Sequence, residues 1–265
     1  MILEGFVQGI GVLGPGLSNW PNAAAVLCGH RDYAPEATVL PTPSLLPPTE
    51  RRRTGRMVKL ALAIASEAVA HAGIASAHLR SIFSSSSGDG HICHEICQAL
   101  ASEPREISPT RFSNSVHNAS AGYWSIATGA TLASTVVCAF DGSFCAGLLE
   151  ALSQVSVDRE PVLLVAYDAE YPDPLHAKRP VPDAFGMALV LTPSRNETSA
   201  ARIEVALETA PADVLQDSRL EALRRAIPAA RSLPLARQLA LGAPGRTILE
   251  YLDVCNLAVD VAPCT

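Results

Sequence analysis

Near the middle of this sequence, a short run of β-branched residues leads through a tight turn into a helix. Ser134–Val137 has the composition of a strand, and apolar residues at helical spacing continue from Gly142 to Leu152. In α/β enzymes a turn of this kind holds a nucleophile, because the dipole and free amides at the start of the helix stabilise a thiolate or an oxyanion. We therefore expect a turn with the geometry of a catalytic site.

Strands and helices alternate on both sides of this turn. Apolar spacing from Met57 to Ala72 predicts a helix that ends at Gly73, and we expect it to be the first helix, after a proline-rich loop from Pro35 to Pro48. Further strands are expected at Gly5–Leu13, Arg80–Ser85, Pro161–Ala166, Phe185–Leu191 and Arg202–Leu207, with helices at Ile92–Leu100, Ser113–Thr128 and Ala212–Ala230 and one or two last strands within Thr247–Val261. The alternation predicts an α/β fold with a mainly parallel, doubly wound sheet.

The composition favours an assembly over a free monomer. Hydrophobic residues make up 48% of the 265 residues, charged residues make up 17%, and the mean hydropathy is +0.21. This composition leaves more apolar surface than a soluble monomer usually exposes. The net charge of -6 argues against a nucleic-acid partner, because phosphate binding requires a basic surface.

The cysteine pattern indicates neither disulfides nor a metal site. Seven cysteines lack the spacing of a disulfide framework or a zinc ribbon, which fits a reducing cytoplasm. The cluster His91, Cys93, His94 and Cys97 offers two or three soft ligands without a fourth group, so ordinary helix packing is favoured and no metal is expected. The N-terminus lacks the basic start of a signal peptide, and no apolar stretch is long enough to span a membrane.

Three motifs carry a resemblance to a known family: Ser113–Asn118, Ala121–Ser125 and Ala139–Phe144. Their order resembles that in the β-ketoacyl synthases of type II fatty-acid and polyketide synthesis, and most of all the short chain-length factors of bacterial aryl polyene pathways. The resemblance implies a thiolase-like fold with the N-terminal half largely kept and the C-terminal half truncated or degenerate. It implies a ketoacyl-synthase-like N-terminal domain over residues 1–210 and a short remnant of the C-terminal half, residues 211–265, packed on it.

The departures from the family pattern imply that catalysis is lost. In the Cys-x-x-Gly turn of that family, Gly142 takes the place of the glycine and Ala139 takes the place of the acyl-accepting cysteine, followed by Phe140 and Asp141. The two histidine motifs of the family are missing, and His176 is the only histidine after Leu152. Without these groups, decarboxylative condensation has no nucleophile and no stabiliser of the developing charge. We expect a non-enzymatic subunit without a cofactor.

The resemblance also implies partners. A chain-length factor pairs with a ketosynthase, helps to set the acyl chain length, and meets an acyl carrier protein transiently. The residues expected at the subunit interface and the wall of the partner's acyl tunnel are Asn114, His117, Asn118, Ala121, Gly122, Tyr123 and Trp124. The basic residues Arg51, Arg52, Arg53 and Arg56 are either a solvated helix start or a docking spot for the acidic carrier protein.

Several alternatives stay open. A stand-alone acyl transferase or thioester hydrolase would use Cys138 with His117 or His176, although a strand residue one step from the nucleophile position points to the other face, which favours a buried structural thiol. A third hypothesis is that the chain docks the acyl carrier protein and has no effect on the length of the acyl chain. Asp141 either caps the following helix or, with Phe140, plugs the lost acyl site. His117 and Asn118 either bond within the helix entry or face the partner.

Overall fold

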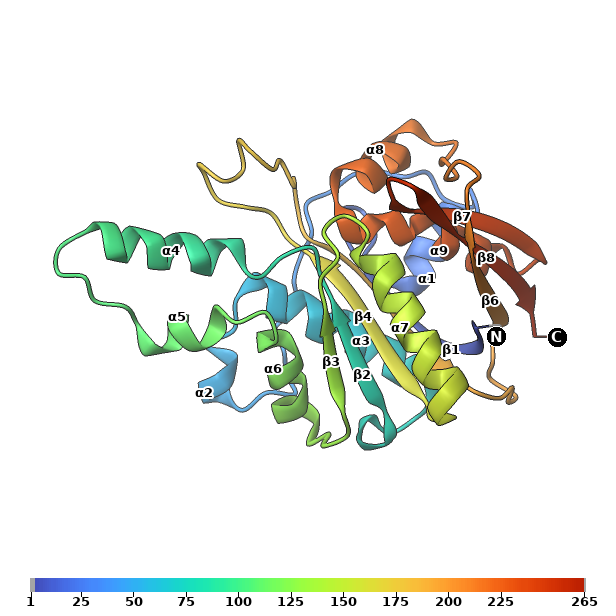
Figure 1. Cartoon of the computed structure of the whole chain (residues 1–265), viewed down its shortest axis with the longest axis horizontal. Helices are drawn as coiled ribbons and strands as arrows, with labels where there is room; N and C mark the ends of the chain where they lie inside the picture. Colours follow the sequence, from blue (N-terminus) through green and yellow to red (C-terminus); the bar gives the residue numbers. More distant parts are fainter. Residues whose placement is uncertain (1–2, 265) are drawn as a thin grey trace.

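The computed structural model describes residues 3–264, and a single mixed sheet runs through it (Figure 1). In chain order the elements are β1 (Leu3–Leu13), α1 (Trp20–Leu27), α2 (Pro48–Arg51), α3 (Arg56–Ala72), η1 (Ser76–His78), β2 (Arg80–Ser84), α4 (Gly90–Ala101), α5 (Pro109–Asn114), α6 (Ala119–Thr128), β3 (Ser134–Val137), α7 (Ser143–Asp158), β4 (Val162–Asp168), β5 (Phe185–Thr192), β6 (Ala201–Glu208), α8 (Ser218–Ala226), η2 (Pro228–Ser232), α9 (Leu233–Leu241), β7 (Gly245–Leu252) and β8 (Cys255–Pro263). Within residues 3–264, no helix combines the length and apolar character needed to cross a membrane.

The sheet order is β3-β2-β4-β5-β1-β6-β8-β7. Only β3, β2 and β4 are parallel, and every other pair is antiparallel, so the prediction of a mainly parallel sheet is wrong. The segment that joins β4 to β5 contains no helix, and antiparallel neighbours need no helical crossover between them. The order of segments along the chain predicts a helical crossover between each pair of successive strands, which this connection does not have.

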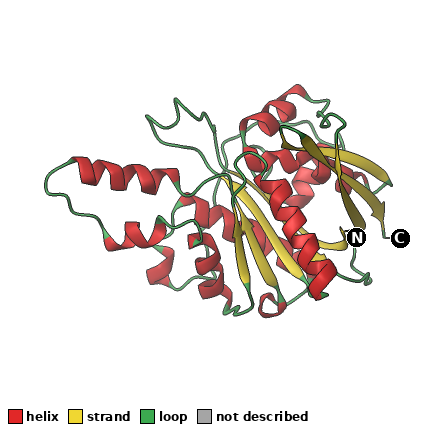
Figure 2. Cartoon of the chain, viewed as in Figure 1, coloured by secondary structure: helices red, strands yellow, loops and turns green. Residues whose placement is uncertain are grey.

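Helices cover both faces of the sheet and form two apolar cores (Figure 2). Helix α3 lies so close to β1 that the strand needs glycine opposite it: a Cβ at Gly9 would lie 2.1 Å from the carbonyl oxygen of Ala68, and one at Gly11 would lie 2.2 Å from that of Ile64. Helix α7 fills the other core through residues such as Leu148 and Leu152. The strand that leads into the predicted turn, β3, forms one edge of this two-sided sheet.

The structure corrects three predicted helices. Helix α1 precedes the proline-rich loop instead of following it, and Asn19 caps it by accepting a hydrogen bond from the amide of Asn22 at 2.8 Å. The predicted helix Ser113–Thr128 is two helices, α5 and α6, separated by residues 115–118. The predicted helix Ala212–Ala230 begins only at Ser218, and Pro228 starts a separate 3-10 turn because proline cannot continue the helix.

Residues 211–264 continue the same sheet. Strand β6 pairs with β1 on one side and β8 on the other, and β8 then pairs with β7. The chain after the predicted boundary at residue 210 thus supplies the last two strands and the helices α8 and α9. Its origin as a remnant of a C-terminal half stays a prediction.

Candidate functional site

The predicted turn between β3 and α7 is present and sharp. Phe140, at its tip, has a φ of 50°, which is uncommon for a residue with a side chain. Position 142 has room only for glycine, because a Cβ there would lie 2.6 Å from the carbonyl oxygen of Tyr251. Neither Ala139 nor Phe140 carries a nucleophilic atom, so the turn has the form of a nucleophile turn without the reactive group. The assignment of Ala139 as the lost cysteine's position stays a prediction.

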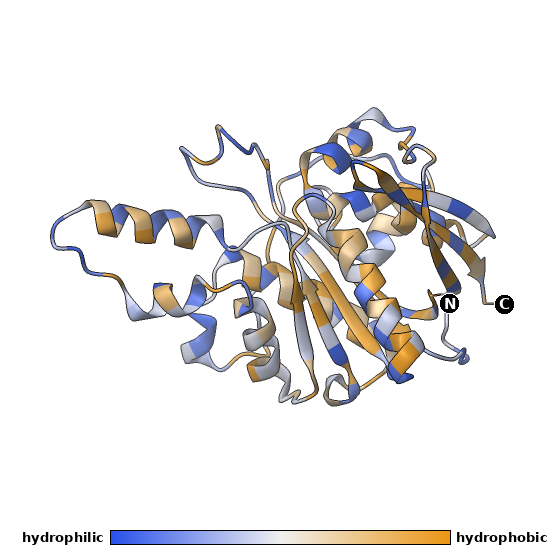
Figure 3. Cartoon of the chain, viewed as in Figure 1, coloured by the Kyte–Doolittle hydropathy of each residue, from blue (hydrophilic) through white to orange (hydrophobic). Residues whose placement is uncertain are grey.

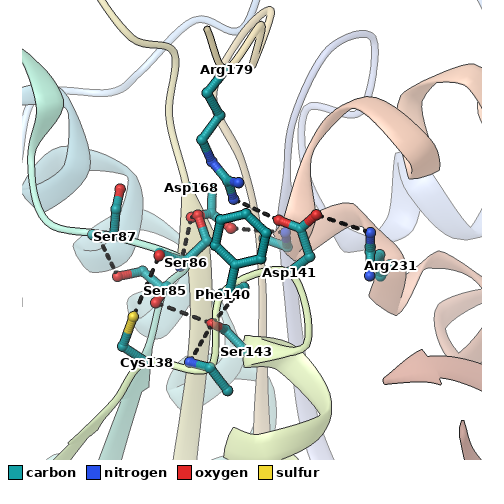
Figure 4. Close-up of polar contacts among 12 residues, drawn as sticks. Ser85, Ser86, Ser87, Cys138, Phe140, Asp141, Ser143, Asp168, Arg179 and Arg231 are labelled. Carbon is teal, nitrogen blue, oxygen red and sulfur yellow. Dashed lines mark hydrogen bonds and ion pairs between the residues drawn. The ribbon is translucent and has the colours of Figure 1, made fainter. Parts of the chain in front are cut away.

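A buried hydroxyl holds this turn together. The Ala139 amide donates to the Oγ of Ser143 at 2.9 Å, and that hydroxyl lies 2.6 Å from the Phe140 carbonyl oxygen and 3.2 Å from that of Ser85 (Figure 4). Ser143 is the first residue of α7 and is 2% exposed. Its hydroxyl is therefore occupied in shaping the turn and is closed to solvent, which removes it as a substitute nucleophile.

Asp141 does not cap α7, so the capping interpretation is wrong. The helix has no side-chain cap, and the carboxylate instead meets Arg179 Nη2 at 2.6 Å and Arg231 Nη2 at 3.1 Å. The Arg179 guanidinium also lies over the Phe140 ring, with its Cζ 4.1 Å from the ring centre. We call Phe140, Asp141, Arg179 and Arg231 the elbow clamp. Arg179 joins the turn to the β4–β5 loop, and Arg231 joins it to η2. Their guanidinium groups hold the Asp141 carboxylate away from the amides at the start of α7.

A second connection lies beneath the clamp at the end of β4. The buried carboxylate of Asp168 accepts hydrogen bonds from the Ser86 amide at 2.9 Å, the Ser86 hydroxyl at 2.7 Å and the Ala229 amide at 2.9 Å. Burial raises the pKa of Asp168 to about 6, although these hydrogen bonds oppose the shift. Residues far apart in sequence thus fix the position of the turn. Sequence reasoning missed Asp168, because one aspartate at a strand end gives no local signal of its partners.

Cys138 is exposed, which contradicts the prediction of a buried thiol. The residue follows an edge strand, and no strand among the described residues, 3–264, pairs with the outer side of that edge. Its Sγ lies 3.3 Å from the Ser86 carbonyl oxygen, whereas the His117 Nε2 lies 3.2 Å from the Ser85 hydroxyl. Within residues 3–264 no hydrogen bond joins this thiol to a histidine, neither to His117 nor to His176, so no base is in place to activate it.

The predicted interface residues divide into two groups. Ala121, Tyr123 and Trp124 are largely buried in the chain's own core, although Tyr123 also borders the groove between α5 and α6. Asn118 and Gly122 are exposed on the opposite face of α6 and line a shallow groove of about 480 Å³ between α5 and α6.

The two remaining interface candidates have contacts within the chain. Asn114 is buried, where its side chain donates to the Arg53 carbonyl oxygen at 2.8 Å and accepts from the Tyr123 hydroxyl at 3.1 Å. His117 lies between α5 and α6 rather than on a helix, and burial lowers its pKa. Its ring bonds to Ser85 on a different element, so it does not serve the helix entry.

Two of the four arginines between α2 and the start of α3 form ion pairs. Arg53 meets Glu50 at 3.1 Å, and Arg56 meets Glu170 and, at 3.4 Å, Asp183. Arg51 and Arg52 have no ion pair within residues 3–264. Arg53 and Arg56 stay 48% and 42% exposed in these ion pairs, and a docking role for the four arginines stays a prediction. On α4, Cys93 and Cys97 are exposed, and the described residues contain no cluster of histidine, cysteine or carboxylate groups suited to a metal ion.

Comparisons with known proteins agree with this geometry. A chain in the structure of the ketosynthase ApeO in complex with its chain length factor ApeC from Xenorhabdus doucetiae is 23% identical, with a TM-score of 0.73 over 97% of this chain and 98% of that chain. A chain of the ishigamide ketosynthase/chain length factor is 14% identical, with a TM-score of 0.73 over 98% of this chain. A chain of the type II polyketide synthase complex AntDE:AntF, an acyl-carrier protein with its ketosynthase, is 11% identical with a TM-score of 0.75.

These likenesses, each below 25% identity, show that the fold is the predicted thiolase-like fold of the ketosynthases. No curated protein sequence matches the chain. The model of the β-ketoacyl synthase N-terminal domain matches residues 21–240, which is most of the chain and extends past the predicted boundary at residue 210. The chain therefore belongs to the β-ketoacyl synthase family, through the N-terminal domain of that family.

Proposed function

We propose that this chain is the non-catalytic, chain-length-factor half of a ketosynthase heterodimer. The observation that carries the proposal is the turn itself, which keeps the shape of a nucleophile turn and has Ala139 and Phe140 where a reactive group would stand. A subunit that keeps this framework without the nucleophile serves the reaction by assembling with an active partner. The solved neighbours that include ketosynthase and chain length factor complexes support the same role.

The two edges of the sheet support pairing through β3. At the β7 edge, the loop at Asp213 covers the strand: the Asp213 amide donates to the Ile248 carbonyl oxygen at 2.8 Å, and the Ile248 amide donates to the Asp213 carboxylate at 3.0 Å. At the β3 edge, no strand within residues 3–264 pairs with the outer side. Natural proteins cover exposed edges, so a bare edge in an otherwise covered sheet indicates an intermolecular partner.

The surface around β3 supports the same conclusion. Large apolar side chains are exposed on α4 to α6 and in the loop before β3: Leu100, Phe112, Val116, Ile126 and Leu132. Helix α4 has no buried residue and, with α5, projects from the body of the molecule (Figure 1). Hydrophobic segments alternate with hydrophilic ones along it (Figure 3). An amphipathic helix held away from its own core has its apolar side free for another chain.

The finer parts of the proposal rest on the sequence motifs. The motifs between Ser113 and Phe144 resemble those of aryl polyene chain-length factors, which favours an aryl polyene pathway, a transient acyl carrier partner and a part in setting acyl length. The groove beside Asn118 and Gly122 is the surface of α6 that can reach a partner's tunnel. We further propose that residues 1–210 derive from the N-terminal half of a ketosynthase and residues 211–265 from its C-terminal half.

A proline at Val136 tests the pairing. The Ser81 and Ser85 amides of β2 donate to the carbonyl oxygens of Ala133 and Val137, so the alternation along the strand places the Val136 amide on the outer side. Val136→Pro removes an outward donor and spares the bonds to β2, a change that edge strands tolerate. We expect the variant to lose at least tenfold in affinity for its ketosynthase partner, measured by sizing and titration.

The matched control is Val136→Thr, which keeps the amide and the branched shape and is expected to pair like the wild type. Circular dichroism of each isolated variant establishes that the fold is intact. A folded Val136→Pro chain that binds the ketosynthase with wild-type affinity would contradict pairing through β3.

The exposure of Cys138 favours one second candidate, a thiol-dependent acyl transferase or hydrolase. In that case Cys138→Ala abolishes the activity of an intact complex and of the isolated chain on acyl thioesters. The proposed non-catalytic role predicts nearly unchanged condensing activity in the complex, because the thiol has no activating base in contact.

A further inference from the structure

A basic pocket lies beside the elbow clamp. It has a volume of about 360 Å³, and its charged walls are Asp141, Lys178, Arg179, Arg225 and Arg231. These residues come from the β3–α7 turn, the β4–β5 loop and the region of α8 and η2. Figure 4 shows Arg179 and Arg231 approaching Asp141 from different sides. The pocket thus forms only in the folded chain, where three distant segments meet.

The charges of the pocket are unbalanced. Four cationic side chains line it and a single carboxylate faces them, although the whole chain has a net charge of -6. Asp141 pairs with Arg179 and Arg231, and Arg231 also meets Glu250 at 3.3 Å outside the pocket wall, so the imbalance rests on Lys178 and Arg225, which are exposed and have no ion pair within residues 3–264. Like charges gathered around one cavity repel each other, and a bound anion relieves that repulsion.

One buried donor in this wall also has no acceptor. The Nε–H group of Arg179 is closed to solvent and has no hydrogen-bond partner among residues 3–264. Buried donors almost always have an acceptor, and a guanidinium has no other way to satisfy its N–H groups. An oxyanion in the pocket meets the exposed donors of Lys178 and Arg225 directly, and it reaches the closed Nε–H group only when the Arg179 side chain turns toward the pocket.

We infer that this pocket binds a phosphate group, either free or as part of an organic phosphate. Phosphate oxygens match the fork of donors on arginine, and the pocket combines three arginines with one lysine. Its volume lies in the range of small-molecule sites, so it has room for more than a bare ion, and Pro180, Val181 and Pro228 supply an apolar wall for the rest of the ligand. Every residue comes from this one chain, so the inference does not depend on the proposed heterodimer.

Calorimetric titration of the full chain at constant ionic strength tests the inference. The probes are phosphopantetheine, pantetheine, which has the same organic part without the phosphate, and inorganic phosphate. We expect saturable binding of both phosphate compounds and none of pantetheine. Tighter binding of phosphopantetheine than of inorganic phosphate identifies the arm of a carrier protein as the source, and equal binding identifies free phosphate. Absence of saturable binding by either phosphate compound overturns the site.

Charge variants locate the binding. Lys178→Gln and Arg225→Gln each remove an exposed cation without breaking an ion pair, so each should weaken phosphate binding about fivefold or more. Asp141→Asn should tighten it, because the carboxylate no longer competes for Arg179 and Arg231. Arg31→Gln removes one exposed charge outside the pocket and should change nothing. Equal effects of Arg31→Gln and the pocket variants would show unspecific attraction and overturn the inference.

Discussion

Gly122 gives the sharpest test of how α6 is used. It lies inside the helix, is exposed, and has ordinary helical backbone angles, and an added Cβ would meet nothing within 4 Å. Glycine inside a helix is less stable than alanine by about 0.5–1 kcal/mol. No contact among residues 3–264 explains why glycine stands at this position. Close approach of a partner's backbone, expected next to the bare β3 edge, does explain it.

Gly122→Ala should therefore act in opposite directions on the isolated chain and on the complex. The isolated variant should be more stable by about 0.5–1 kcal/mol, which for a chain of this size raises the thermal midpoint by about 1–4 °C. An extra methyl group in a packed interface costs about 1–3 kcal/mol, so the dissociation constant of the heterodimer should rise about fivefold to a hundredfold. Differential scanning calorimetry measures the first quantity and titration with the ketosynthase measures the second.

Gly147 is the matched control within α7. It is also an interior helix glycine, but a Cβ there would lie 2.9 Å from Leu164 Cδ1 and 2.9 Å from Ser84 Cβ. Gly147→Ala should thus lower the thermal midpoint of the isolated chain, where Gly122→Ala raises it. A Gly122→Ala chain that is stabilised and still binds the ketosynthase with wild-type affinity would refute the interface on this face of α6.

Three further predictions follow from the site and the sheet edges. Since the pKa of Asp168 in the folded chain is about 6, above the ordinary 3.8, its stabilising contribution is complete below about pH 4 and is lost as the pH rises through 6; urea unfolding should show this fall, and Asp168→Asn should not. Asp213→Ala removes the acceptor of the Ile248 amide and of the Thr247 hydroxyl, so it should cost about 1–3 kcal/mol in unfolding and cause self-association through β7, measured by light scattering; a monodisperse variant of unchanged stability would contradict the covering role. Iodoacetamide should alkylate Cys138 in the free chain and much more slowly in the heterodimer, as mass spectrometry resolves; equal rates would place this thiol outside the interface.

Local patterns in the sequence predicted most elements of the fold. Strand β3 has the predicted bounds, Ser134–Val137, and the helix that ends at Gly73 matches α3, because a left-handed glycine at its end is a strong local signal. The direction of the sheet was not predictable in this way. Alternation shows that strands and helices follow one another, but β5 lies between β4 and β1 because of tertiary packing, which the order of segments does not encode.

The break between α5 and α6 has a similar cause. Nothing in residues 115–118 is a proline or glycine, so the sequence reads as one continuous helix. The structure ends α5 at Asn114, whose buried side chain bonds to the Arg53 backbone and to Tyr123. Contacts with distant residues thus override a weak local preference, and the same break places His117 beside Ser85.

The candidate site shows the limit of local reasoning most clearly. The residue types around Asp141 predict the turn, and they suit a helix cap as well as an ion pair. The choice between the two is made by Arg179 and Arg231, which lie 38 and 90 residues away in the sequence. Both guanidinium groups bind the carboxylate, and that of Arg179 also lies over the exposed ring of Phe140, so the contacts that hold this turn also line the basic pocket beside it. The position of the Asp141 carboxylate therefore depends on the C-terminal segment that supplies Arg231, and this contact gives the residues after 210 a part in the site itself.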